Sequence, residues 1–281
     1  MNKKPIAWIV DSTAFISEEL KQHPDFFSVP LNIHFGEEQF VDGKDLTPEQ
    51  LYVKIKDATE FPKTSQPSAG EFAERFKEIA EGYDEAVAVH VSAKLSGTLA
   101  SSTAGAEIAG FPVTFIDSLA LSYGITGIIE KGMAMHAGGA TVPEIKEQLE
   151  KMAGTLQNFI LIGQLDQLYK GGRMSGVQFF LGSLLKVKPI VQISKEGELL
   201  AIDKVRSEKK ALQYLVDKVA TSPGANSRKI YLMHGNVIDQ AIHLKNLLTE
   251  QVPGLEVVIG DISSTLAVHA GEGTLAILWF D

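Results

Sequence analysis

The chain has 281 residues, of which 44% are hydrophobic and 22% charged, so it can bury a substantial core and does not resemble a disordered protein. It contains no cysteine, which excludes disulfides, thiolate nucleophiles, iron–sulfur clusters and cysteine-bound zinc. Its formal net charge of −9 argues against nucleic acid or an anionic membrane as the main partner, because either would repel the chain.

The N-terminal end shows no pattern of a targeting segment. A short apolar run ends at Val10, where Asp11 interrupts it, whereas a signal peptide needs a longer apolar region and a small-residue cleavage site. No apolar run in the sequence approaches the length that crosses a bilayer. We therefore expect a cytoplasmic protein.

Three uninterrupted apolar runs in the first half predict strands that are buried on both faces of a parallel sheet. These runs are Ile6–Val10, Ala86–Val91 and Val113–Ile116. Each run ends in a polar loop that carries hydroxyl groups. Capping boxes that begin at Thr47, Ser68 and Thr141 predict helices. This order predicts right-handed βαβ connections, with a ligand beyond the carboxyl ends of the strands. The segments 27–35 and 39–41 predict an appended hairpin.

The second half has a different pattern. A strand is expected at 159–163 and a helix at 177–185. The next two runs, 187–193 and 198–204, predict an antiparallel pair. Two more helix–strand alternations follow and end at 274–280. The predicted fold is therefore α/β with two domains that hold the ligand between them: residues 1–155 with a mostly parallel sheet and flanking helices, and residues 156–281 with a mixed or antiparallel sheet.

The common catalytic signatures are missing from the sequence. It has no G-x-x-x-x-G-K-[ST] phosphate loop, no G-x-S-x-G nucleophile elbow and no H-E-x-x-H zinc motif. The seven histidines are scattered without the spacing of metal ligands. We therefore expect neither a metal nor a cofactor.

Two hydroxyl-rich segments are candidates for an anion site. In the first, Ser68 caps a helix, but Thr64 and Ser65 are not needed for capping and can donate to a carboxylate or phosphate. In the second, Ser96 and Gly97 follow a buried strand and enter a helix, where glycine lets the backbone approach a ligand closely. Taken alone, each segment is also explained by a turn and a helix cap.

Two arginines and a histidine are further candidates. Arg173 follows two glycines in a flexible loop, and its planar guanidinium matches a phosphate or carboxylate. Arg206 lies just before a predicted helix and is weaker support. His269 is flanked by glycines at a predicted strand start, where a neutral imidazole can donate to a bound carboxylate. Each is also compatible with a solvated or structural side chain.

Together these segments resemble the DegV family of bacterial fatty-acid-binding proteins over nearly the whole chain. The resemblance depends on the order and spacing of several short motifs: Val10-Asp11-Ser12-Thr13, Thr64-Ser65-Gln66-Pro67-Ser68, Leu95-Ser96-Gly97-Thr98, Asp117-Ser118 with Ser122 and Gly124, Gly171-Gly172-Arg173-Met174-Ser175, Lys188-Pro189, Arg206, and His269 with Gly271 and Gly273. The chain departs from the family's usual H-T-G-P-G at Ala270 and Glu272, and Met174 replaces a branched aliphatic residue.

The resemblance implies a long-chain fatty acid buried between two α/β domains. It implies that Thr64 and Ser96 hold the carboxylate with His269 beside them, and we place Ser65 and Gly97 in the same group. Arg173 and Arg206 are expected to serve the acyl phosphate or the docking of a kinase. On this basis the protein is a non-catalytic subunit that presents the fatty acid to a separate fatty-acid kinase for phospholipid synthesis. A transient encounter with a membrane is compatible with this role.

Two other functions remain open at the level of the sequence. The chain can be a hydrolase that uses Ser96 or Ser65 with His269 and Asp117, or a sensor of an anionic small molecule such as a sugar phosphate. For the carrier, we expect Thr64→Ala and Ser96→Ala to lower fatty-acid occupancy. We expect Arg173→Ala to retain the lipid and to impair its phosphorylation by the kinase.

Overall fold

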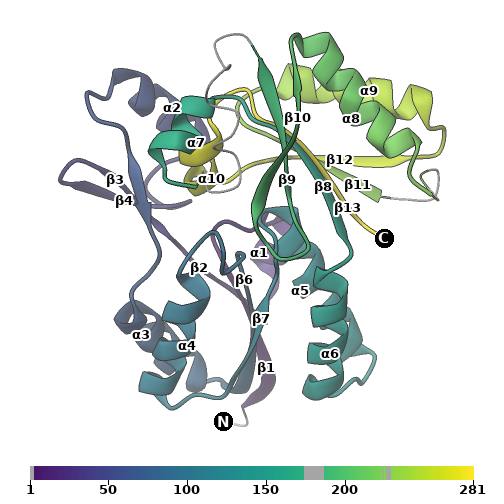
Figure 1. The fold of residues 1–281 in the computed structure, drawn as a ribbon. Coiled ribbons are helices and arrows are strands. Elements are labelled where there is room, and N and C mark those ends of the chain that lie inside the picture. Colours follow the sequence, from purple (N-terminus) through teal and green to yellow (C-terminus); the bar gives the residue numbers. More distant parts are fainter. Residues whose placement is uncertain (1–2, 174–186, 224, 226–228) are drawn as a thin grey trace.

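Two large β-sheets flanked by helices, and a small three-stranded sheet, make up the computed structural model, which describes residues 3–173, 187–223, 225 and 229–281 (Figure 1). The helix expected at 177–185, together with Met174 and Ser175, lies outside the described residues. Within the described residues, no helix combines the length and the apolar composition that a membrane-spanning segment requires.

The first sheet is entirely parallel and contains the three strands that the apolar runs predict. Its strand order is β2-β1-β6-β7. The strands are β1 (Lys4–Asp11), β2 (Phe26–Val29), β6 (Tyr83–His90) and β7 (Val113–Asp117). Along β1 the side chains alternate: Trp8 and Val10 pack toward one face, and Ala7 and Ile9 toward the other. Burial on both faces explains why these strands are uninterrupted apolar runs.

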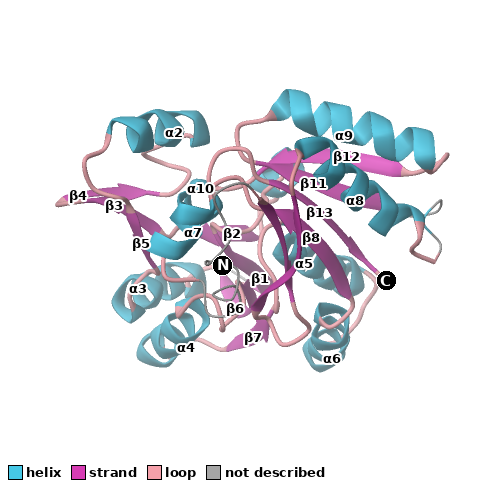
Figure 2. Ribbon diagram, turned by 45° about the horizontal axis from the view of Figure 1, so that its top comes forward, coloured by secondary structure: helices cyan, strands magenta, loops and turns pink. Residues whose placement is uncertain are grey.

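Helices cover both faces of the parallel sheet (Figures 1 and 2). α3 and α4 pack on one face, and α5 and α6 on the other. All three capping boxes are confirmed, because Thr47, Ser68 and Thr141 are the N-cap residues of α2, α3 and α6. The helices of this half are α1 (Glu18–Gln22), α2 (Pro48–Asp57), α3 (Ala69–Ala80), α4 (Thr98–Ala109), α5 (Tyr123–Ala137) and α6 (Val142–Ala153).

The predicted hairpin is shorter than the sequence suggested. Residues 26–29 belong to the parallel sheet as β2, and Pro30, which lacks a backbone N–H, follows that strand directly. The hairpin consists of β3 (Asn32–Phe35) and β4 (Glu38–Val41), and the short strand β5 (Lys63–Ser65) pairs with β3. This small sheet and α2 contribute buried side chains to the core of the second half, where α2 contacts α10.

The second sheet is mixed, with the order β10-β9-β8-β13-β11-β12 and one parallel pair, β11–β12. The expected antiparallel pair β9–β10 is confirmed. Three helix–strand alternations follow it, rather than the two predicted. The elements are β8 (Leu156–Leu161), α7 (Leu165–Lys170), β9 (Lys188–Ile193), β10 (Leu199–Val205), α8 (Glu208–Ala220), β11 (Lys229–His234), α9 (Ile238–Gln251), β12 (Glu256–Asp261), α10 (Ser264–Ala270) and β13 (Leu275–Phe280).

The two faces of the mixed sheet have different neighbours. Along β8, Phe159 and Leu161 pack toward α8 and α9, whereas Ile160 and Ile162, the residue after the strand, point toward the parallel sheet. This alternation places apolar side chains between the two sheets, and the predicted α/β class with one parallel and one mixed sheet is confirmed. The boundary at residue 155 falls in the turn between α6 and β8, and as a division into domains it stays a prediction.

Candidate functional site

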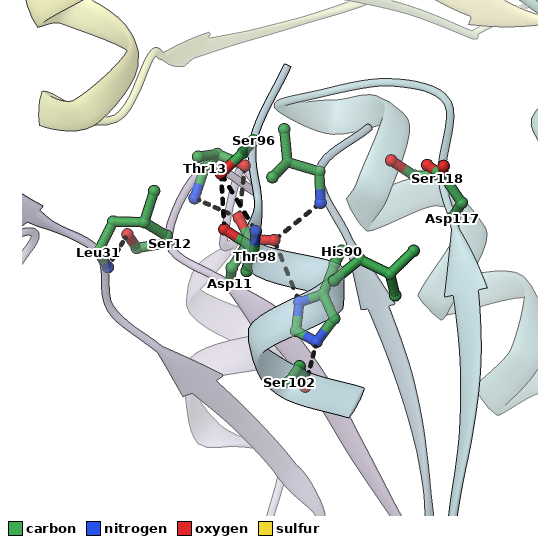
Figure 3. A network of polar contacts seen from close by, with 12 residues as sticks. Asp11, Ser12, Thr13, Leu31, His90, Ser96, Thr98, Ser102, Asp117 and Ser118 are labelled. Atoms are coloured by element: carbon green, nitrogen blue, oxygen red, sulfur yellow. Dashed lines mark hydrogen bonds and ion pairs between the residues drawn. The ribbon is translucent and has the colours of Figure 1, made fainter. Parts of the chain in front are cut away.

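The site begins at the carboxyl ends of β1 and β6, where a buried carboxylate joins two loops (Figure 3). The chain leaves β1 toward β2 on one side while β6 lies on the other, which creates the crevice where α/β sheets bind ligands. Asp11 accepts hydrogen bonds from the backbone N–H of Thr13 (3.0 Å) and of Val91 (2.8 Å), and its Oδ2 lies 3.2 Å from His90 Nδ1. Burial raises the pKa of Asp11, but the hydrogen bonds, led by that of His90, bring it below its ordinary value. Asp11 therefore holds the two loops together.

Above these loops lies a narrow cavity between the two sheets. Its volume is about 100 Å³. Fourteen of its 22 lining residues are apolar, and both halves of the chain contribute. From the first half come Leu31, Val91, Leu95 and Leu121, and from the second Ile160, Ile162, Leu168, Leu199, Met233, Ile262, Leu266, Ala270, Ala276 and Leu278. Such a lining suits an extended apolar chain.

Four of the eight polar residues that line the cavity are the ones predicted from the sequence. On β5, the Oγ1 atom of Thr64 lies 2.8 Å from Nε2 of His269. Ser96 precedes α4, and its hydroxyl lies 2.8 Å from Thr98 Oγ1. Arg173 follows α7. Thr64, Ser96, Arg173 and His269 are thus brought to one apolar cavity, as the anion-site interpretation requires.

His269 lies on helix α10, not at a strand start as the sequence suggested. Its Nδ1 has no hydrogen-bond partner within the described part of the chain and faces Gly171, where an added Cβ would lie only 2.2 Å away. Burial and then the charge of Arg173 lower the pKa of His269 to about 4, so the ring is neutral at neutral pH.

We assign the single proton of this ring to Nε2. A proton on Nδ1 would be a buried donor without an acceptor, which costs about 1–3 kcal/mol. With the proton on Nε2, His269 donates to Thr64 Oγ1. The hydroxyl proton of Thr64 then remains free for a bound anion. The histidine acts by orienting the threonine.

Arg173 supplies the positive charge of the cavity. Its Nη1 donates to the carbonyl oxygen of Gly171 (2.6 Å), and its Nε lies 3.4 Å from that of Leu95. No carboxylate of the described residues lies within ion-pair distance of this guanidinium. Burial lowers the pKa of Arg173. A partly buried cation without a counter-ion favours an anionic ligand.

The other predicted site residues lie elsewhere. Ser65 Oγ is 2.8 Å from His34 Nε2, because successive side chains of β5 point to opposite faces and Thr64 takes the cavity side. Gly97 is the N-cap of α4, where an added Cβ would lie 2.9 Å from Gln66 Nε2, so it allows close packing against the preceding loop. Neither lines the cavity.

Arg206 is exposed at the end of β10, beyond Val205. It is not among the residues that line the cavity. Arg206 is therefore separate from the cavity, whereas Arg173, which we grouped with it, belongs to the same polar group as Thr64 and His269.

The described residues do not assemble a nucleophile–histidine–carboxylate relay at the cavity. His269 contacts Thr64 rather than a serine, and Ser96 bonds to Thr98. Asp117 accepts from the backbone N–H of Ala93 and of Leu119. The described residues also contain no group of three or more His, Cys, Asp or Glu side chains placed to hold a metal ion.

The sequence did not reveal two features of the site. The apolar lining comes in part from alternate residues at the end of β8 and along β13 and from one side of α10, and in sequence these look like any core positions. Gly171 was read as part of a flexible loop, but it is the C-cap of α7 and is packed against His269. A structure was needed, because the two residues are far apart in the chain.

Comparisons of the sequence and of the structure with known proteins all find the same family. The family model described as "Uncharacterised protein, DegV family" matches residues 5–281. Protein DegV of Bacillus subtilis is 32% identical over 283 residues, covering 98% of each chain. A structure described as fatty acid binding of a DegV family protein from Thermus thermophilus covers 99% of this chain and 100% of its own, with a TM-score of 0.89 and 26% identity.

A third structure shares the fold at lower identity. It is the fatty acid kinase B3 protein of Streptococcus pneumoniae loaded with linoleic acid, which covers 99% of each chain with a TM-score of 0.85 and 23% identity.

Proposed function

This chain belongs to the DegV family, and we propose that it binds a long-chain fatty acid in the cavity between its two sheets. The observation that carries the proposal is the position of Arg173. It is a partly buried cation without a carboxylate partner among the described residues, and it shares an apolar cavity with Thr64, Ser96 and His269. The relative from Thermus thermophilus, which is described as fatty-acid binding, supports the same ligand class.

In this proposal the carboxylate lies among the polar side chains and the acyl chain follows the apolar lining. Thr64 and Ser96 donate hydroxyl hydrogen bonds, and Arg173 balances the charge. We revise our first expectation on this point, which separated Arg173 from the carboxylate. Ser65 and Gly97 lie outside the cavity and are not among the ligands we propose.

The energetics favour tight retention of such a ligand. Burial of a long acyl chain yields about 0.8 kcal/mol per CH₂, or roughly 10 kcal/mol in all. Loss of translational and rotational freedom on association offsets a large part of this. A buried carboxylate without donors would cost several kcal/mol more, and the four polar side chains prevent that cost.

We further propose that the protein is a non-catalytic cytoplasmic carrier whose fatty acid is phosphorylated by a separate kinase. Support comes from the family resemblance and from the lack of a nucleophile–histidine–carboxylate relay at the cavity among the described residues; the Ser102–His90–Asp11 chain is fully buried. Arg206 is exposed and does not line the cavity, so its role in this proposal is contact with the kinase.

Extraction and mass spectrometry of the ligand test the proposal. Protein purified from cells should release one fatty acid per chain on denaturation, and the delipidated protein should rebind palmitic or oleic acid. Release of a sugar phosphate instead, or hydrolysis of acyl esters that Ser96→Ala abolishes, would show that the protein is a sensor or a hydrolase.

A further inference from the structure

Ser122, at the start of α5, places a second polar group in the cavity. Its side chain lines the cavity and is 2% exposed. Its Oγ has no hydrogen-bond partner in the described part of the chain. The backbone N–H of Ser122 donates to Thr13 O at 3.0 Å, which fixes the residue beside the loop after β1. A buried hydroxyl without a partner is unfavourable for the folded protein, so it needs an explanation.

The backbone of Ser122 is also strained. Its φ of +54° and ψ of −131° lie in a region that residues with a Cβ rarely adopt and that glycine adopts freely. Among the described residues only Leu119 and Asn236 share a positive φ without being glycine. A glycine at position 122 would remove both the strain and the unpaired hydroxyl. Strain of this kind is concentrated at functional sites.

The hydroxyls of Thr13 and Thr274, which also line the cavity, have internal partners, whereas Thr265 Oγ1 on α10 has none in the described part of the chain. The Thr13 hydroxyl donates to Asp11 Oδ1. The Thr274 hydroxyl donates to the carbonyl oxygen of Ala270 (2.8 Å) and accepts from the N–H of Gly163 (3.0 Å). In contrast, Ser122 Oγ is available to a ligand, at the N-terminus of a 15-residue helix whose dipole favours an oxygen atom there.

Ser122 and Ser96 approach the cavity from opposite faces of the parallel sheet. Ser96 precedes α4, which covers one face of the parallel sheet, whereas Ser122 begins α5, which covers the opposite face (Figure 1). Next to Ser122, Leu121 lines the cavity with apolar atoms. A fatty acid whose carboxylate lies by Thr64 and Arg173 would therefore present part of its chain to Ser122.

We propose that Ser122 binds an oxygen substituent on the acyl chain, so that the ligands of this protein include hydroxy fatty acids. This inference rests on the proposed fatty-acid binding. A serine hydroxyl both donates and accepts, and it therefore complements a neutral chain hydroxyl, which would otherwise be buried without a partner. A second charged group does not fit, because the described charge of the cavity is that of Arg173, at the carboxylate end.

The test compares stearic acid with its positional series of monohydroxystearic acids on the delipidated full-length protein, by displacement of a fluorescent fatty acid. One position, or two adjacent ones, should bind at least as tightly as stearic acid, and the remaining positions should bind about tenfold more weakly. Ser122→Ala removes the hydroxyl and keeps the Cβ. It should weaken the binding of the preferred isomer by about tenfold, so that the positional preference is lost, and it should change the affinity for stearic acid less than twofold.

Ser122→Gly is the matched variant, because it removes the hydroxyl and the strain together. It should lose the same preference and unfold at a higher temperature than Ser122→Ala. Two results together would overturn the proposal. Every hydroxylated isomer would bind more weakly than stearic acid, and Ser122→Ala would leave the ratio of the two affinities unchanged. If neither stearic acid nor any isomer displaces the probe, fatty-acid binding itself is refuted, and this inference fails with it.

Discussion

His269 Nε2 lies 2.8 Å from Thr64 Oγ1, although 205 positions separate the two residues in the chain. The contact joins α10 of the second half to the short strand β5 of the first. Because the ring nitrogen is a donor here, it orients the threonine hydroxyl toward the cavity. The contact therefore links the polar group that we propose for the carboxylate to the packing of the two halves.

Replacing Thr64 with valine should weaken fatty-acid binding. Valine has the same shape but no hydroxyl, and a hydrogen bond to a charged group contributes about 1.5–3 kcal/mol, or roughly 10- to 100-fold in affinity. Ser65→Ala is the control, because the hydroxyl of Ser65 faces His34. Displacement titration of a fluorescent fatty acid measures both variants, and equal losses would show that Thr64 has no special role.

Replacing Arg173 with methionine should lower the affinity for fatty acid without lowering the stability of the ligand-free protein. The variant loses the charge that faces the carboxylate, so we expect fatty-acid affinity to fall by about tenfold or more. The ligand-free variant should be at least as stable as the wild type, because a partly buried cation without a counter-ion has been removed. Chemical denaturation measures the stability.

Lys170→Met removes an exposed positive charge nearby and serves as the control for Arg173→Met. We expect it to leave fatty-acid affinity within twofold. If Arg173→Met retains the lipid as well as this control does, the arginine does not hold the carboxylate, and the original assignment to the kinase is favoured.

The low pKa of His269 should make stability depend on pH. The folded pKa is about 4, and the ordinary value of histidine is 6.5. Between these values the unfolded chain binds the proton more tightly, so the free energy of unfolding rises with pH from 4 to 6.5 and is lost as pH falls. The contribution is about 3 kcal/mol at most. Denaturation of wild type and His269→Gln across this range measures it, and identical pH slopes would contradict the assignment.

Gly171→Ala should disturb the site without contacting the ligand. The added Cβ would lie 2.2 Å from His269 Nδ1, so the ring must shift from the position in which its Nε2 contacts Thr64. Gly154→Ala is the matched control: both glycines are helix C-caps with nearly the same backbone angles, and Gly154 has room, with the nearest atom at 3.6 Å. We expect lower fatty-acid affinity for Gly171→Ala alone. Equal affinities would show that the position of His269 is unimportant.

Gly197→Ala should loosen the contact between the two sheets. Gly197 lies in the β9–β10 turn, where its carbonyl accepts from Ser92 Oγ at 2.8 Å, and an added Cβ would lie 2.2 Å from that oxygen. Gly43→Ala has a similar positive φ but no atom within 4 Å, and it isolates the backbone strain. We expect faster fatty-acid dissociation and a lower melting temperature for Gly197→Ala than for Gly43→Ala.

Local patterns in the sequence were sufficient for much of the fold. Apolar runs predicted the parallel strands, and capping boxes predicted the starts of α2, α3 and α6, because strand burial and helix capping depend on residues close together in the chain. The hairpin was predicted too long, because residues 26–29 are equally suitable for a parallel strand. Whether they pair with β1 or with β4 depends on the surrounding sheet.

For the site, the sequence by itself determined which residue types are available, and the family resemblance indicated the ligand. Only the tertiary structure showed that Thr64 faces the cavity while Ser65 faces His34, and that Arg173 belongs with His269 while Arg206 does not. The physical reason is that the cavity is formed where two sheets meet. The packing of the two sheets decides which side of a strand or helix borders the cavity. No local sequence pattern contains information about that packing.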